Sequence, residues 1–162
     1  MIKYIFNIII FFWFLGCSNS KDITLIDINS EDLLNKINYF KNEKAVLLNV
    51  WALWCKPCIE EFPMIVSLDR EFEDLEVIFV SADFNDQRDD VKKFLKTHNI
   101  LGKSYIKVEN DESFINNLLD GWDGTLPFTI VFSKSSGNIV DFWVGKESET
   151  YFRSTLIKAL ET

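Results

Sequence analysis

Two cysteines separated by two residues are the part of this chain whose type and spacing most directly indicate chemistry. Cys55 and Cys58 follow the apolar run 45–51, which predicts a buried strand because it is short, rich in aliphatic residues and bounded by polar ones. The pair therefore stands where a strand passes into a helix. Unpaired backbone N–H groups and the positive end of the helix dipole stabilise an anion there, so a thiol ionises more readily than in a free cysteine. This position indicates redox chemistry.

The two cysteines are expected to have different roles. Cys55 comes first, at the exposed end of the helix, and is the candidate nucleophile that forms a mixed disulfide with a substrate. Cys58, one turn later and more buried, would resolve that bond. Lys56 adds positive charge that favours the Cys55 thiolate, and Pro57 fixes φ where a missing N–H costs little; both are expected to border the substrate. A structural disulfide is the alternative, but closing a loop of two residues constrains the unfolded chain weakly.

The first sixteen residues have the features of an export signal. Lys3 is their only charge, and residues 4–15 are almost wholly apolar, a length suited to a signal-peptide core and short for a membrane span. We predict that residues 1–16 are a signal peptide. Cys17, after a small residue, resembles the lipidated cysteine of bacterial lipoproteins, with residues 17–22 as the attachment site and tether. An uncleaved anchor, or an ordinary signal peptide with an incidental cysteine, is the alternative; each exports the domain.

Length and charge limit the classes of function. The 162 residues are 48% hydrophobic, which indicates one globular domain, expected at residues 23–162. Removing Lys3 with the signal peptide changes the basic count from 17 to 16 against 25 acidic residues, and so changes the formal charge from −8 to −9. Nucleic acids and anionic membrane surfaces are poor partners for such a charge.

Apolar periodicity predicts strands that alternate with helices along the domain. Strands are expected at 23–28, 45–51, 76–82, 105–108, 128–132 and 138–144. Helices are expected at about 30–40, from the cysteines to about 72, at 86–97, at 114–119 and in the C-terminal segment 151–160, with Ser30 and Asp86 as N-caps. Early strands separated by helices and a final hairpin imply an α/β fold, a central mixed β-sheet with helices on both faces.

Several of these features together resemble the thioredoxin superfamily. They are the order of strands and helices, the CxxC at the start of the helix after the central strand, and the proline in the segment 125–128. The longer run 51–63, Trp-Ala-Leu-Trp-Cys-Lys-Pro-Cys-Ile-Glu-Glu-Phe-Pro, and the export signal resemble the exported TlpA/ResA-like thiol-disulfide oxidoreductases. The resemblance covers about residues 25–162. It implies a thioredoxin-like fold with an extra strand–helix insertion at about 103–121 and an N-terminal extension.

The resemblance also implies roles for residues around the cysteines. Pro127 would be a cis-proline facing the CxxC, and the backbone of Leu126 would pair with an extended substrate segment. A proline that only starts a strand is the alternative. Glu61 would take up and return the proton of Cys58, because Asn49 stands where thioredoxins carry a titrating aspartate. The alternative for Glu61 is a solvated charge on the helix surface.

The aromatic residues divide between the site and the core. Trp54 is expected to lie against the cysteines as an apolar platform for substrate. Trp51 and Trp143 are expected in the core, and Trp122 at the rim of the site. His98, the single histidine of the sequence, is expected in a solvated helix end, where it would not bind a metal.

Partners follow from the same resemblance, which implies no cofactor and no metal. The expected partners are protein disulfides or dithiols, a membrane dithiol as electron donor, and the membrane itself through the lipid. The protein is expected to be a monomer in the cell envelope or periplasm, with apocytochrome c cysteines as the substrate suggested by analogy. A lipid-anchored binding module with an inert disulfide is the competing hypothesis. A copper-binding assembly factor would carry CxxxC, and a peroxidase a cysteine in a Pro/Thr-rich loop; neither pattern occurs in the sequence.

Overall fold

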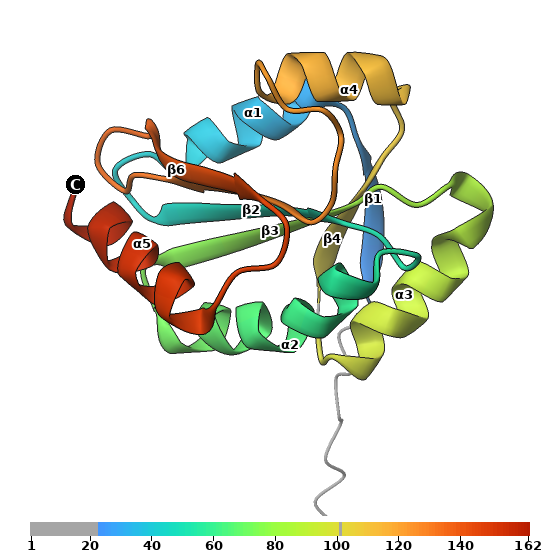
Figure 1. Ribbon diagram of the computed structural model, residues 1–162, viewed down its shortest axis with the longest axis horizontal. Helices are drawn as coiled ribbons and strands as arrows, with labels where there is room; N and C mark the ends of the chain where they lie inside the picture. The colour runs from blue at the N-terminus through green and yellow to red at the C-terminus, as the bar shows by residue number, and fades with distance from the viewer. Residues whose placement is uncertain (1–22, 101) are drawn as a thin grey trace, which may run out of the picture.

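The computed structural model describes residues 23–100 and 102–162 (Figure 1). The predicted signal peptide, Cys17 and the tether lie outside these residues. Within the described ranges, no helix is long and apolar enough to cross a membrane. The chain from residue 23 onward follows the predicted alternation of strands and helices and ends in the predicted hairpin and closing helix.

Six strands in the described part of the chain form one mixed sheet. They are β1 (Thr24–Ile28), β2 (Ala45–Trp51), β3 (Leu75–Ser81), β4 (Lys103–Lys107), β5 (Phe128–Phe132) and β6 (Ile139–Val144). Their order across the sheet is β1-β4-β3-β2-β5-β6. The first four run parallel to one another, whereas β5 is antiparallel to both β2 and β6. β2 leads into the cysteines from the middle of this sheet, and all of its residues are buried.

Helices cover both faces of the sheet, as predicted. They are α1 (Ser30–Tyr39), α2 (Lys56–Glu71), α3 (Arg88–Thr97), α4 (Asp111–Leu118) and α5 (Glu149–Glu161). Figure 1 shows α2, α3 and α5 below the sheet and α1 and α4 above it. The three layers are those of a thioredoxin-like fold. A strand and a helix, β4 and α4, are present where the insertion is expected, and β4 lies between β1 and β3.

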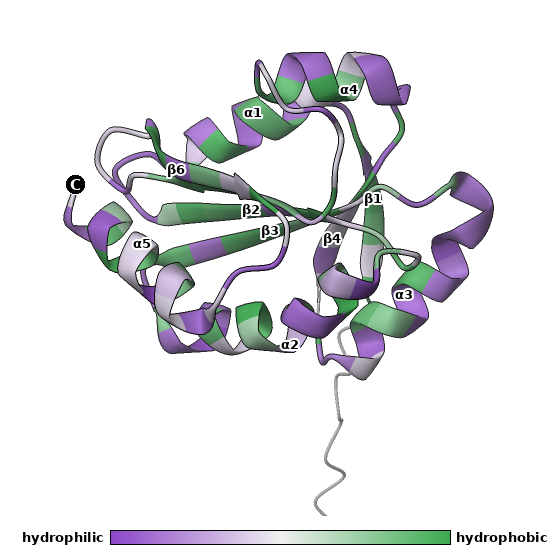
Figure 2. Ribbon diagram, viewed as in Figure 1, coloured by the Kyte–Doolittle hydropathy of each residue, from purple (hydrophilic) through white to green (hydrophobic). Residues whose placement is uncertain are grey.

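Alternation along β2 decides which of its side chains face the cysteine-bearing helix. Leu47 and Trp51 pack in the core shared with α2, α3 and α5, whereas Leu48 and Val50 pack in the core under α1 and α4. Because successive side chains of a strand point to opposite faces, Asn49 falls on the α2 side. Figure 2 shows the hydrophobic residues concentrated along the strands of the sheet and polar residues on the outward sides of the helices. The amide of Asn49 therefore lies in the apolar layer between the sheet and α2.

The start of α1 differs from the prediction by one residue. Asn29, not Ser30, is the N-cap, since the Asn29 carboxamide oxygen accepts from the backbone N–H of Asp32 at 2.8 Å. Ser30 is the first helical residue, and its hydroxyl donates to the Glu109 carboxylate at 2.7 Å. Asparagine and serine are both good N-caps, so the local sequence does not decide which of the two residues caps the helix. The contact of Ser30 with Glu109, which is distant in sequence, leaves Asn29 as the cap.

The start of α3 also differs. Asp86 lies in a short 3₁₀ turn (Asn85–Gln87), and α3 begins only at Arg88. The end of this turn is closed by the Gln87 side chain, which accepts from the backbone N–H of Phe84 at 3.2 Å. The prediction that Asp86 caps a continuous helix is therefore wrong.

The limits of the strands agree with the prediction within two residues. β4 begins earlier than expected because Lys103 pairs with Thr24 of β1.

Candidate active site

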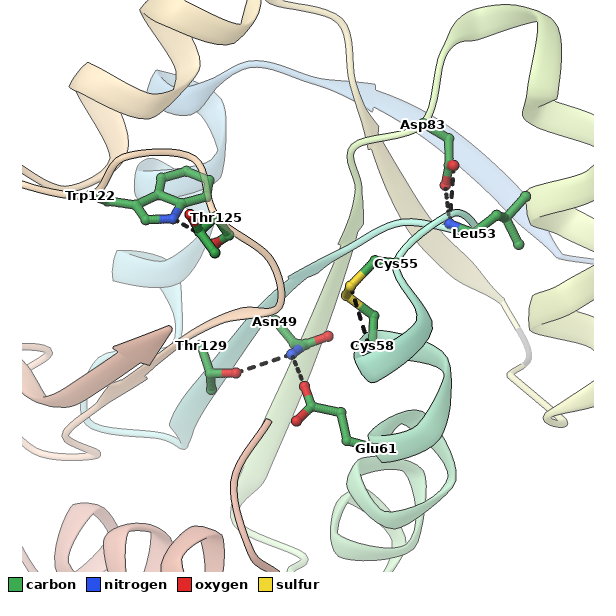
Figure 3. Close-up of a disulfide and its surroundings, with 9 residues drawn as sticks. All are labelled: Asn49, Leu53, Cys55, Cys58, Glu61, Asp83, Trp122, Thr125 and Thr129. Carbon is green, nitrogen blue, oxygen red and sulfur yellow. Dashed lines mark hydrogen bonds between the residues drawn. A yellow bond between two sulfur atoms is a disulfide. The ribbon is translucent and has the colours of Figure 1, made fainter. Parts of the chain in front are cut away.

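The two cysteines form a disulfide at the N-terminus of α2, directly after the loop that follows β2 (Figure 3). Their Cα atoms are 5.3 Å apart. Cys55 is the N-cap of α2, and its sulfur accepts from the backbone N–H of Cys58 at 3.3 Å. The predicted position at a helix start is confirmed. In this oxidised form Cys55 is only 5% exposed and Cys58 1%, so the expectation of an exposed Cys55 is wrong, although Cys55 is the more accessible of the two.

Two residues between the cysteines form the outer surface of the first turn. Lys56 has a side chain that is 88% exposed and lies 4.0 Å from the Glu60 carboxylate. Pro57 is also exposed and stands in the first turn of α2, where its missing N–H has no partner to lose. Both residues are therefore on the outside of the disulfide, and their contact with a substrate stays a prediction.

A buried polar group lies on the sheet side of the cysteines. The Asn49 amide donates to Glu61 Oε1 at 3.2 Å and to the Thr129 hydroxyl of β5 at 3.0 Å (Figure 3). Glu61 stands three residues after Cys58 on the same side of α2, and it is 2% exposed. Its second oxygen, Oε2, has no hydrogen-bond partner among the described residues. The side chain is thus a buried carboxyl group that Asn49 holds through one oxygen, with the backbone of Glu147 as a further neighbour that lowers its pKa.

Burial raises the pKa of Glu61 from 4.5 to about 7, and the hydrogen bond from Asn49 opposes this shift. The alternative of a solvated Glu61 is therefore wrong. It holds for the preceding residue instead: Glu60 has a side chain that is 46% exposed and accepts from Lys146 Nζ at 2.9 Å, a contact that lowers the pKa of Glu60. The two adjacent glutamates have opposite environments, and only Glu61 can change its charge near neutral pH.

A second buried carboxylate lies on the other side of the disulfide. Asp83, just beyond the end of β3, is 2% exposed and accepts from the backbone N–H of Leu53 with both oxygens, at 3.0 and 3.1 Å (Figure 3). The Ser81 hydroxyl donates to Asp83 Oδ2 at 2.8 Å. Burial raises the pKa of Asp83, and these hydrogen bonds oppose the shift. Asp83 thereby connects β3 to the loop in front of Cys55.

An apolar cavity of about 180 Å³ lies beside the cysteine loop. Trp54, 62% exposed, forms part of its wall, and Leu126 and Trp122 form other parts. The Leu126–Pro127 peptide bond is cis, as predicted. Trp122 is more buried than a rim residue, at 8% exposure: its ring stacks on Phe128 with centroids 4.2 Å apart, and its Nε1 donates to the Thr125 carbonyl.

Comparison with known proteins places this arrangement in a family. The model of the AhpC/TSA family matches residues 20–157. The chain belongs to this family. Thiol-disulfide oxidoreductase ResA of Bacillus subtilis is 28% identical over 122 residues, and that of Bacillus cereus is 26% identical over 115. The matches cover 74% and 71% of this chain but only 64% and 63% of the two relatives, so the chain spans less than two thirds of their length.

A solved structure supports the fold of this AhpC/TSA-family chain. The thiol:disulfide interchange protein of Chlorobium tepidum, described as a thioredoxin family protein, superposes with a TM-score of 0.61 at 26% identity. The superposition covers 75% of this chain and 83% of that one. The predicted thioredoxin-like fold is confirmed.

The other aromatic residues of this AhpC/TSA-family chain fall mostly where the sequence predicts. Trp51 and Trp143 are buried in the core, at 0% and 8% exposure. His98 ends α3 but is less solvated than predicted, because its ring packs against Phe94 and Phe62 at centroid distances of 4.2 and 5.3 Å. Within residues 23–100 and 102–162, no group of three or more His, Cys, Asp or Glu side chains is placed to hold a metal ion.

Sequence reasoning missed Asp83 and Thr129 as parts of the site. For Asp83 a signal existed: it follows a parallel strand next to the strand that leads to the cysteines, and the carboxyl ends of parallel neighbours meet at one edge of a sheet. For Thr129 the signal was weaker, since its role depends on β5 pairing antiparallel to β2 so that Thr129 lies opposite Asn49. That pairing joins residues 80 positions apart.

Proposed function

We propose that this protein is a thiol-disulfide oxidoreductase that reduces protein disulfides through Cys55 and Cys58. The observation that carries the proposal is the Cys55–Cys58 disulfide at the N-terminus of α2, with a buried carboxyl group on the same side of the helix. The Cys58 N–H that donates to the Cys55 sulfur would stabilise a Cys55 thiolate in the reduced protein. The names of the ResA relatives agree with this assignment.

The exchange proceeds in two displacements. The Cys55 thiolate attacks one sulfur of a substrate disulfide, forms a mixed disulfide and releases the other substrate sulfur as a thiolate, which takes a proton from water. The Cys58 thiolate then attacks the Cys55 sulfur, which forms the Cys55–Cys58 disulfide and releases the second substrate sulfur as a thiolate that takes a proton. Two electrons have passed from the dithiol to the substrate, and a membrane dithiol donor would return them.

Glu61 is proposed as the group that handles the proton of Cys58. A buried thiol is a poor nucleophile until it loses its proton, and a carboxyl group with a pKa of about 7 can accept that proton near neutral pH. The Asn49 amide would hold the acceptor in place, since it donates to Oε1 and makes no bond to Oε2. Water is excluded from both groups by the surrounding core.

The substrate is proposed to approach the face that carries Trp54, Lys56 and Pro57. All three side chains are exposed, and the backbone at Leu126 and Pro127 would pair with an extended segment of the substrate. The cavity beside Trp54 would take an apolar side chain of that segment. These five residues form the proposed substrate-binding surface.

The cellular setting is proposed from the sequence pattern of residues 1–22. The domain would be exported by the signal peptide and held at the membrane of the cell envelope by a lipid on Cys17. It would act there as a monomer, and cytochrome c maturation is the proposed process. The mass of the native N-terminus tests the anchor, because an unmodified Cys17 contradicts it.

Trapping the mixed disulfide tests the reaction itself. With Cys58 replaced by serine, Cys55 should remain covalently joined to a substrate protein, and turnover should fall by about a thousandfold or more because nothing resolves the bond. Cys55→Ser should trap nothing. If the wild-type protein exchanges with neither insulin nor glutathione disulfide, the disulfide is inert and the binding-module hypothesis replaces this one.

A further inference from the structure

We propose that Asp83 is a positioning residue for Cys55, because its carboxylate holds the turn that carries the nucleophile against the end of β3. The inference rests on the proposed disulfide exchange at Cys55 and adds a residue to it. Asp83 does not touch either sulfur in the contacts described; it acts through the backbone of Leu53, two residues before Cys55.

The turn in question consists of residues 52–55. It is closed by a hydrogen bond of 3.1 Å from the Cys55 N–H to the Ala52 carbonyl. The end of β3 binds this segment at two places: Ala82 N–H donates to the last carbonyl of β2 at 2.8 Å, and Asp83 accepts from Leu53 N–H at 3.0 and 3.1 Å. The second contact lies inside the turn itself and fixes its orientation.

The middle of this turn is less packed than its two ends. Ala52 and Cys55 are 0% and 5% exposed, whereas Trp54 is 62% exposed and Leu53 is only partly buried. A segment with fewer buried contacts is expected to open more readily than a well-packed one. The hydrogen bonds of Asp83 therefore hold the middle of the turn, while apolar packing holds its ends.

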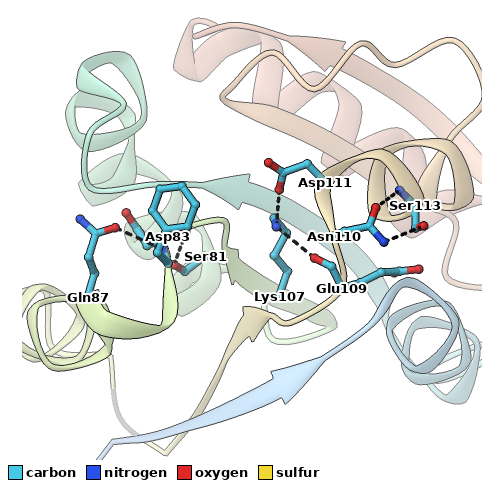
Figure 4. Close-up of polar contacts among 9 residues, drawn as sticks. Ser81, Asp83, Gln87, Lys107, Glu109, Asn110, Asp111 and Ser113 are labelled. Carbon is cyan, nitrogen blue, oxygen red and sulfur yellow. Dashed lines mark hydrogen bonds and ion pairs between the residues drawn. The ribbon is translucent and has the colours of Figure 1, made fainter.

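The carboxylate is itself held in place by its own strand end. The Ser81 hydroxyl donates to Asp83 Oδ2 at 2.8 Å, and the Asp83 N–H donates back to that hydroxyl at 3.1 Å. In the described part of the chain no ion pair joins Asp83 to a cation. Lys107 lines the same surface cavity but directs its ammonium to the Asp111 carboxylate and the Glu109 carbonyl (Figure 4). Asp83 is thus committed to the turn and to Ser81.

Placement of this turn matters because Cys55 has to meet two partners in succession. Its sulfur first attacks the substrate disulfide on the outer side and is then attacked by Cys58 from the inner side, and a misplacement of about 1 Å can cost about a hundredfold in rate. The N–H of Cys58 can stabilise the Cys55 thiolate only while Cys55 keeps its N-cap conformation. Loosening the turn is expected to weaken both functions.

Two substitutions separate positioning from charge. Asp83→Asn and Asp83→Ala both remove the charge, but only asparagine keeps a carbonyl oxygen for the Leu53 N–H and an amide that can donate to the Ser81 hydroxyl. We expect the reduced Asp83→Ala protein to attack a small aromatic disulfide about tenfold more slowly than Asp83→Asn. In glutathione buffers its dithiol should be favoured about tenfold less than that of Asp83→Asn, about 30 mV. A partly buried carboxylate elsewhere provides the control, since Asp69→Ala should keep the wild-type rate.

The outcomes distinguish this inference from the proposed function. If the wild-type protein shows no exchange at all, the proposed function fails whatever the Asp83 variants do. If the wild type is active and folded Asp83→Ala and Asp83→Asn react alike, the positioning role fails and the function stands. Should Asp83→Ala not fold, Ser81→Ala keeps the carboxylate but removes its support. It should lower the rate in the same direction by about threefold, and an unchanged rate and redox equilibrium would overturn the proposal.

Discussion

The Asn49 amide on β2 donates to Glu61 Oε1 on α2 across 3.2 Å, and this bond joins the centre of the sheet to the helix that carries the cysteines. The strand position holds an amide, which does not titrate, and the helix position holds an acid. The amide cannot change its charge, so it orients the carboxyl group without competing for the proton. Of the two side chains, only Glu61 can carry the proton transfer that we propose.

Replacing that acid with its amide should slow the resolving step. Glu61→Gln keeps the size of the side chain and an acceptor for Asn49, but it cannot take a proton, so we expect turnover near pH 7 to fall about a hundredfold. The pH–rate profile should lose its inflection near pH 7. Glu60→Gln is the matched control, because its carboxylate is solvent-exposed and should leave both quantities unchanged. An inflection that survives in Glu61→Gln would assign it to another group.

Stability of the oxidised protein should depend on pH through the same residue. The pKa of Glu61 is raised from 4.5 to about 7 in the folded protein, so the folded state binds more protons than the unfolded state between these values. The contribution of Glu61 to stability is then full below about pH 4.5 and falls by about 3 kcal/mol as the pH rises through 7. Denaturant titrations at pH 4 and pH 8 measure the effect. Glu61→Gln should abolish this loss; an equal loss in that variant would assign it to other groups.

A second carboxyl group at the strand position should share a proton with the first. In Asn49→Asp two acids face each other at the position of a 3.2 Å hydrogen bond, and like charges at that distance cannot both ionise easily. We expect the pair to keep one proton well above pH 7, seen in carbon NMR spectra of the labelled carboxyl groups. Asn49→Leu is the control, as it adds no acid. Two carboxyl groups that both ionise below pH 7 would contradict the prediction.

Removing the exposed platform should affect protein substrates more than small ones. Trp54 is 62% exposed, and covering such a side chain contributes about 1–2 kcal/mol to binding. Trp54→Ala should therefore raise KM for a protein disulfide about tenfold while the reaction with glutathione disulfide stays within about twofold. Tyr39→Ala removes an aromatic ring that is 73% exposed on α1, and it should change the kinetics with neither substrate. Equal losses on both substrates would show that Trp54 acts on the cysteines themselves.

Gly124, three residues before the cis-proline, is expected to be favoured by its positive φ and by a close side-chain neighbour. Gly124 has φ +86°, and a Cβ there would stand 2.5 Å from Ile115 Cδ1 of α4. We expect Gly124→Ala to lower the free energy of unfolding by about 2 kcal/mol, through backbone strain and this contact together. Gly121→Ala, with φ +84° and no atom within 4 Å, should cost only the strain. Shortening the neighbour in Gly124→Ala/Ile115→Val should recover the difference, and no recovery would refute the contact.

Local signals predicted the parts of this structure that depend on neighbours in sequence. The buried run ending at Trp51 predicted β2 residue for residue, since a short, mostly apolar stretch flanked by polar residues admits few alternatives. The caps were less determined: Asn29 and Ser30 are both good N-caps, and the contact of Ser30 with Glu109 decided between them. The prediction that Asp86 is an N-cap was wrong for a similar reason. The Gln87 side chain accepts from the Phe84 N–H and stabilises a 3₁₀ turn in which Asp86 lies.

Contacts between distant segments set the limit of prediction at the site. The sequence suggested Glu61 through a family resemblance. The sequence pattern of a helix does not show whether a given glutamate is solvated or buried. Only the packing of α2 on the sheet shows that Glu60 is exposed and Glu61 is buried. Asp83 and Thr129 were missed because their partners, Leu53 and Asn49, lie 30 and 80 residues away. Such pairs follow from strand order, which residue patterns determine only loosely.

The separation of Asn49 and Thr129 along the chain also determines how late in synthesis the surroundings of the cysteines are completed. A ribosome delivers the chain from the N-terminus, so both cysteines emerge well before β5, which lies next to β2 in the finished sheet but comes 80 residues after Asn49 in the chain. Until that late strand is inserted, the thiols have neither the Thr129-supported amide nor the Leu126–Pro127 segment near them. Until β5 docks, both cysteines therefore stand without the neighbours that surround them in the folded protein, so the site is completed by one of the last strands to be made.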